Sequence, residues 1–168
     1  MRVNKNERLI DMEEYRDAIL WPANLNEAGP DMPREEADVE ENLRFLRING
    51  GVFWDTAARR KELMGPFEGY IYNTLPIGKV EWKCIIEFVI NRDRLLGMVD
   101  QHRYIPSFRM QCLTGHFRDG RRHDPSPTWI KILDFEKLRN PLDLQDFEKL
   151  DGTPVENVRG GFVYITPP

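Results

Sequence analysis

Two stretches in the first third of the chain carry apolar side chains at helical spacing. Residues 10–20 and residues 35–48 both show this pattern, so each predicts an amphipathic helix. Acidic residues fall in the first turns of the second stretch, where the helix dipole favours negative charge. Gly50 is typical of a helix end. The prolines between residues 22 and 34 predict a loop between the two helices.

After residue 51 the apolar period changes to two, which is typical of strands. The clearest strand is predicted for residues 79–90, and its apolar face consists of Val80, Trp82, Cys84, Ile86 and Phe88. Charged side chains alternate with that face. Shorter strands are expected at residues 52–54, 69–72, 128–135 and 161–165.

Three further segments are less regular. Residues 59–64 predict a helical turn, residues 142–150 predict a helix or turn, and residues 92–125 predict an irregular insert. The order of elements favours an α+β fold, a small curved or barrel-like β-sheet of about five to six strands with flanking helices. We expect residues 1–168 to form a single domain.

Composition narrows the class of protein. Hydrophobic residues make up 40% of the chain and charged residues 31%, which is typical of a globular protein. Cys84 and Cys112 have no zinc-ligand spacing, so we expect two buried thiols in a reducing compartment. Without a long apolar run or a signal peptide, the chain is expected to be cytoplasmic and not to contact a membrane.

Charge is unevenly distributed along the chain. Residues 1–50 carry 7 basic and 12 acidic side chains, whereas residues 102–123 carry five arginines and a single acidic residue. A local basic segment on an acidic protein indicates either an anionic partner or a solvated arginine-rich loop. The candidates for phosphate binding are Arg103, Arg109, Arg118, Arg121, Arg122 and Lys131.

Catalytic motifs are not evident in the sequence. The chain has no phosphate loop, no HExxH and no GxSxG, so we expect neither an enzyme nor a cofactor or metal. One alternative is a metal-dependent nuclease, in which Asp31 and Glu81 would hold Mg²⁺ and Lys83 would activate water. The other interpretation of Glu81 and Lys83 is the exposed, alternating face of a half-buried strand.

Aromatic residues gather on the predicted strands, where most of them are expected in the core. Trp54 differs, because it follows Gly50-Gly51 and precedes Asp55-Thr56 at the end of a strand. Such a position is typical of an aromatic ring that is partly exposed at the mouth of a pocket.

Two groups of residues resemble the YTH and EVE branches of the PUA-like superfamily. The first runs from Gly51-Val52-Phe53-Trp54-Asp55-Thr56 through Gly69-Tyr70-Ile71-Tyr72 to Gly78 and a long strand. The second runs from Trp129-Ile130-Lys131-Ile132 through Leu138-Arg139-Asn140-Pro141 to Asp151-Gly152-Thr153-Pro154-Val155. The resemblance covers about residues 50–90 and 128–165, and it rests on the order that the pieces share.

The resemblance implies a barrel-like sheet that opens onto an aromatic pocket for a flipped, often methylated, base. It would make Trp54 a wall of that pocket and Asp55 and Thr56 its polar neighbours, with Tyr70 and Tyr72 beside them. The chain departs from the family in three ways: it has no clear counterpart of the second cage tryptophan, it lacks a glycine in the strand at 79–90, and it carries the insert at 92–125.

The chain also resembles the N-terminal recognition domain of McrB-like modification-dependent restriction systems. This implies a specificity module that binds nucleic acid, with DNA favoured over RNA, and a GTPase motor as a partner in the same or another chain. Two alternatives stay open: the metal-dependent nuclease, and a protein-interaction module that uses the acidic helices at residues 10–48.

Overall fold

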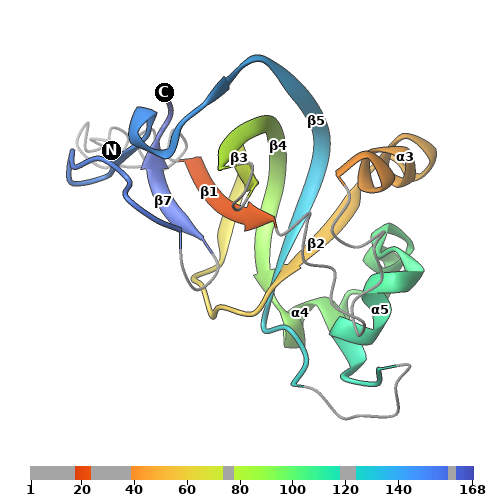
Figure 1. Cartoon of the computed structure of the whole chain (residues 1–168). Helices are drawn as coiled ribbons and strands as arrows, with labels where there is room; N and C mark the ends of the chain where they lie inside the picture. Colours follow the sequence, from red (N-terminus) through yellow and green to blue (C-terminus); the bar gives the residue numbers. More distant parts are fainter. Residues whose placement is uncertain (1–17, 24–38, 74–77, 118–123, 159–161) are drawn as a thin grey trace, which may run out of the picture.

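The computed structural model describes residues 18–23, 39–73, 78–117, 124–158 and 162–168. Figure 1 shows a strongly curved sheet with helices gathered at one side. The described residues form a mixed, open sheet of seven strands. The α+β class predicted from the sequence is therefore confirmed, with a larger sheet than expected.

The sheet has the strand order β2-β5-β4-β3-β1-β7-β6. Its strands are β1 (Ala18–Ala23), β2 (Val52–Thr56), β3 (Leu63–Asn73), β4 (Lys79–Asn91), β5 (Thr128–Leu142), β6 (Glu148–Lys149) and β7 (Val163–Thr166). Neighbouring strands are antiparallel except β1 and β3, which are parallel. Strand β2 lies at one edge of the sheet, and this edge positions the site described below.

The helices cluster at the β2 side of the sheet (Figure 1). They are α3 (Val39–Asn49), α4 (Arg92–Gly97), the 3-10 helix η1 (Val99–Tyr104) and α5 (Ser107–Thr114), and a second 3-10 helix, η2, covers Leu144–Asp146. Helices α3 and α5 contact β2, and α4 contacts β4 and β5. The helix predicted for residues 35–48 is confirmed from residue 39 onward, and its first residues lie outside the described part. Gly50, with a φ of 82°, ends α3, and its N–H donates to the Leu46 carbonyl.

Strand β4 confirms the clearest strand of the sequence prediction, but not its uniform apolar face. Trp82, Cys84 and Ile86 pack in one apolar cluster, whereas Val80 and Phe88 belong to two others. The pairing of β4 with β5 shifts register between Val80 and Trp82 and between Ile86 and Phe88. Because a bulge turns the following side chains to a new direction, strict alternation fails at these two points.

The helix predicted for residues 10–20 is wrong where the structure describes it. Residues 18–20 belong to β1, and residues 10–17 lie outside the described part. Ala18, Ile19 and Leu20 are all fully buried, because β1 lies between β3 and β7. A continuous apolar run is typical of such a strand and can imitate one face of a helix.

Other boundaries also differ from the prediction. The helical turn expected at 59–64 is wrong, because β3 begins at Leu63. Residues 92–125 are not simply irregular, since they contain α4, η1 and α5. Residues 142–150 contain the 3-10 helix η2 and the short strand β6 rather than one helix. The other expected strands are present, with bounds that differ by a few residues.

Both cysteines are buried, as predicted. Burial raises the pKa of the Cys84 thiol well above its usual value, which leaves it an inert part of the core. Within the described ranges, no helix has the length and apolar character that crossing a membrane requires.

Gly69 lies where β3 passes closest to the neighbouring side chains. A Cβ at this position would lie 2.5 Å from Ile86 Cδ1, 2.7 Å from Trp21 Cζ3 and 2.8 Å from Cys84 Sγ. No room exists for a methyl group unless these core side chains move. The glycine of the Gly-Tyr-Ile-Tyr segment is therefore required by packing.

We expect Gly69→Ala to lower the free energy of unfolding by about 1–3 kcal/mol, because the added methyl overpacks the core. Gly97→Ala is the matched control, since nothing lies within 4 Å of the Cβ it would add. Chemical denaturation of both variants measures the difference. Equal stability of the two variants would contradict the packing described here.

Candidate functional site

Trp54 is buried, and the expectation of a partly exposed ring is wrong. Only 6% of the residue is exposed. Its indole meets Trp21 edge-on at a centroid distance of 6.2 Å and Phe135 at 6.5 Å. Trp54 does not line either of the two pockets that are described below. The polar neighbours in the sequence misled the prediction, because helix α5 covers this end of β2.

Arg109 of helix α5 is the residue that covers Trp54. Its guanidinium lies 4.4 Å from the centre of the indole ring and donates to Asp55 Oδ1 at 2.7 Å and to Asn42 Oδ1 at 3.1 Å. The Arg109 side chain is only 1% exposed. We name Asn42, Trp54, Asp55, Arg109 and Ser126 the Arg109 cluster.

Ser126 joins this cluster to the segment that leads into β5. Its hydroxyl donates to Asp55 Oδ2 at 2.6 Å, and its backbone N–H donates to the Cys112 carbonyl at 2.8 Å. The Trp129 indole N–H donates to the Ser126 carbonyl at 2.9 Å. These contacts hold four elements together: α3, β2, α5 and the start of β5.

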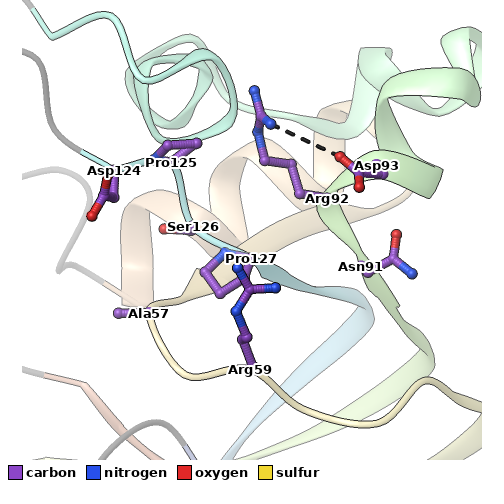
Figure 2. Close-up of a pocket in the computed structure, with 9 residues that line it drawn as sticks. All are labelled: Ala57, Arg59, Asn91, Arg92, Asp93, Asp124, Pro125, Ser126 and Pro127. Carbon is purple, nitrogen blue, oxygen red and sulfur yellow. Dashed lines mark ion pairs between the residues drawn. The ribbon is translucent and has the colours of Figure 1, made fainter.

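Ser126 also lines a pocket of about 580 Å³ (Figure 2). Its wall comes from the segment after β2, from the junction of β4 with α4 and from the residues before β5. We name it the arginine pocket, and it is lined by Ala57, Arg59, Asn91, Arg92, Asp93, Asp124, Pro125, Ser126 and Pro127. Its volume lies within the range usual for small-molecule sites.

The backbone of the arginine pocket is fixed by hydrogen bonds. The Thr128 hydroxyl donates to the Ala58 carbonyl at 2.7 Å and accepts from the Arg60 N–H at 3.1 Å, which ties the segment after β2 to β5. The Arg92 N–H donates to the Pro127 carbonyl at 2.9 Å. Asn91 caps α4 by accepting from the Arg94 N–H at 2.8 Å.

Two guanidinium groups belong to this pocket. Arg59 is exposed, and no contact of its side chain with another described residue is found. Arg92 is held by a hydrogen bond of 2.6 Å from its Nε to the Leu113 carbonyl. Asp93 lies 4.0 Å from Arg92 Nη1 and its side chain is 94% exposed, so water screens its charge. Two guanidinium groups and two carboxylates, those of Asp93 and Asp124, therefore line this pocket.

The structure does not bring the predicted base-pocket residues together. Tyr70 and Tyr72 pack in a different apolar cluster from Trp54. Alternation along β3 explains this, because Ile71 faces the cluster of Trp54 and its two neighbours face away. Tyr70 is buried and donates to Glu68 Oε2, and Thr56 is buried beside the cluster. Asp55 is engaged by Arg109 and Ser126.

The predicted phosphate contacts separate into three groups. Arg109 and Lys131 are buried, so the prediction that they contact phosphate at the surface is wrong. Lys131 Nζ lies 2.7 Å from both Gln101 Oε1 and Glu87 Oε2. Arg103 is exposed and stacks on Tyr104 at 4.6 Å. The remaining three, Arg118, Arg121 and Arg122, lie outside the described residues.

The residues of the nuclease alternative are not assembled as that hypothesis requires. Glu81 and Lys83 lie on the half-buried face of β4, and Lys83 Nζ pairs with Glu68 Oε1 at 2.9 Å. Asp31 lies outside the described part. Among the residues that the structure describes, no group of three carboxylate, histidine or cysteine ligands comes together.

Sequence reasoning missed Arg59, Arg92 and Ser126, and it misplaced Arg109. Arg109, Cys112 and Leu113 form the buried face of α5, at the i, i+3, i+4 spacing of a helix stripe. That spacing can be read from the sequence, but an arginine at one of its positions is more readily interpreted as an exposed loop residue. No signal in the sequence pointed to Arg59 or Arg92, because their proximity depends on the sheet pairing.

Comparison of the chain with protein-family models, curated proteins and solved structures finds no match.

We expect Trp54→Ala to lower the free energy of unfolding by about 3–5 kcal/mol, because it removes a buried ring and leaves a cavity. Thermal or chemical denaturation measures the loss. A stability unchanged from that of the parent protein would show that the ring is not packed as described.

We expect Arg109→Met to cost about 3–5 kcal/mol, because it leaves the Asp55 carboxylate without its cation. The double variant Arg109→Met/Asp55→Met should recover part of that loss, since it removes both charges. Arg47→Met, at an exposed position of α3, is the control. A double-mutant cycle of unfolding free energies tests the pair, and strictly additive losses would exclude the coupling.

Proposed function

We propose that this chain is a nucleic-acid-binding module that contacts phosphate groups at the arginine pocket. The single observation that carries the proposal is the pair of guanidinium groups, Arg59 and Arg92, on the wall of one pocket. Arginine is the side chain best suited to phosphate, because its planar donors match the phosphate oxygens. Phosphate contacts supply most of the affinity of such modules without reading the sequence.

The two guanidinium groups favour binding of an anion over binding of a cation. Arg92 is oriented by its bond to Leu113, so it loses little conformational entropy when it binds. Arg59 is exposed and can adjust to the position of the ligand. Asp93 and Asp124 also line the pocket and would repel an anion. Both residues are exposed, and salt and water weaken their effect.

The free energies of the contacts involved argue against stacking of a base on Trp54 in this conformation. A base could reach the indole only if Arg109 left the ring and broke its pair with Asp55. Breaking a buried pair costs about 3–5 kcal/mol, whereas stacking returns about 1–3 kcal/mol per base. We therefore place the contact at the arginine pocket and not at Trp54.

The resemblance to PUA-like domains adds a finer proposal. The α+β class, the curved sheet and the helices at one side support an architecture of that kind. A specificity domain of a modification-dependent restriction system, with a GTPase motor as its partner, would suit such a module. Capture of a flipped base would then require α5 to move.

We expect Arg59→Glu to weaken binding of a single-stranded oligonucleotide by about 10- to 100-fold, because a charge-assisted contact is lost and repulsion is added. The slope of log affinity against log salt should fall by about one. Fluorescence anisotropy with DNA and RNA oligonucleotides at several salt concentrations measures both quantities.

The matched control is Arg139→Glu, which makes the same change of charge. Arg139 is exposed on β5, roughly 35 Å along the strand from Thr128. Equal weakening in the two variants would show a general effect of charge and would contradict a contact at the arginine pocket.

A further inference from the structure

A second pocket lies beside the segment that joins β2 to β3, where Arg60 lines it. It has a volume of about 540 Å³, and its lining includes Arg60, Lys149, Leu150, Asp151, Phe162 and Tyr164. The turn after β6 forms one wall, and the start of β7 forms the other. We name it the Leu150 pocket.

The floor of the Leu150 pocket is apolar and aromatic. Leu150 is 54% exposed, one of the large apolar side chains that the described fold leaves in solvent. Tyr164 is half-buried and meets Phe162 edge-on, with a centroid distance of 5.4 Å. Burial raises the pKa of the Tyr164 hydroxyl above its usual value. Such a floor accepts the flat face of a ring.

The rim of this pocket is cationic. The Arg60 guanidinium lies 5.2 Å from the centre of the Phe162 ring, and its Nε donates to the Phe162 carbonyl at 3.2 Å. Lys149 is exposed on the opposite wall. The one carboxylate, Asp151, accepts from the Thr153 N–H and hydroxyl, and these bonds lower its pKa. An apolar floor with two cations suits a ligand that joins a flat ring to an anion.

The two pockets are neighbours along the chain. Arg59 lines the arginine pocket, and Arg60 lines the Leu150 pocket. Consecutive Cα atoms are only about 3.8 Å apart, so the two pockets meet at one short segment, and an extended ligand that crosses this segment would contact both side chains. A nucleotide is such a ligand, because its base is flat and its phosphate is anionic.

We propose that the Leu150 pocket is a second nucleotide site, in which an unpaired base stacks on Leu150 and Tyr164 while its phosphate contacts Arg60 and Lys149. This inference rests on the proposed function and adds the substrate class: single-stranded nucleic acid that spans both pockets. Stacking on such a floor tolerates any base, because every base has a flat face.

The test is the dependence of affinity on oligonucleotide length. Wild-type protein, Leu150→Asp and Ile48→Asp are titrated with labelled oligothymidylates of two to about twelve nucleotides. Ile48 is 83% exposed on α3, so its variant introduces the same chemical change far from either pocket. Leu150→Asp should lower the affinity for the longer oligomers by about tenfold or more and leave dinucleotide binding within about twofold. Ile48→Asp should change neither.

Each outcome distinguishes the second site from the proposed function. If Arg59→Glu weakens binding but Leu150→Asp leaves the length dependence unchanged, the second site is refuted and the proposed function stands. If Leu150→Asp weakens the binding of dinucleotides and of long oligomers equally, two separate sites are excluded. If no variant affects oligonucleotide binding and an acidic aromatic peptide binds at Leu150 instead, both proposals fail.

Discussion

The ion pair between Arg109 and Asp55 organises the end of the fold that holds the candidate site. It is buried, and its guanidinium also contacts Asn42 and the face of Trp54. Burial of two charges is unfavourable unless they pair and their remaining donors and acceptors are satisfied. The four elements that supply these partners are therefore fixed relative to one another. Ser126 connects this ion pair to the arginine pocket, since its hydroxyl donates to Asp55 and the residue also lines that pocket.

The parts of the fold that the sequence predicted are those in which local pattern and tertiary context agree. The alternation of Trp82, Cys84 and Ile86 predicted β4, and the spacing in residues 39–48 predicted α3, because α3 and this part of β4 each bury one face only. The sequence pattern did not predict the strand at residues 18–20, since a strand buried on both faces has no alternation. The alternating pattern also fails to predict the side-chain directions beside Val80 and Phe88, because the bulges there arise from strand pairing.

The site was less predictable than the fold. Trp54 was singled out for its polar neighbours, yet its exposure is decided by α5, which begins more than 50 residues later. The sequence predicts a surface cation at Arg109, because an arginine in a basic segment usually faces solvent. Its place on the stripe with Cys112 and Leu113 makes it part of the core. Arg59 and Arg92 become neighbours only through the pairing of β2, β5 and β4.

The most direct test of the central claim is an amide and indole NMR titration with a short single-stranded oligonucleotide. Contact at the arginine pocket predicts shift changes in the backbone of residues 57–61, 91–93 and 126, with the indole N–H of Trp54 unchanged. Large changes at the Trp54 indole and none around Arg59 and Arg92 would contradict it. That result would show that the base reaches the buried ring and that Arg109 leaves it.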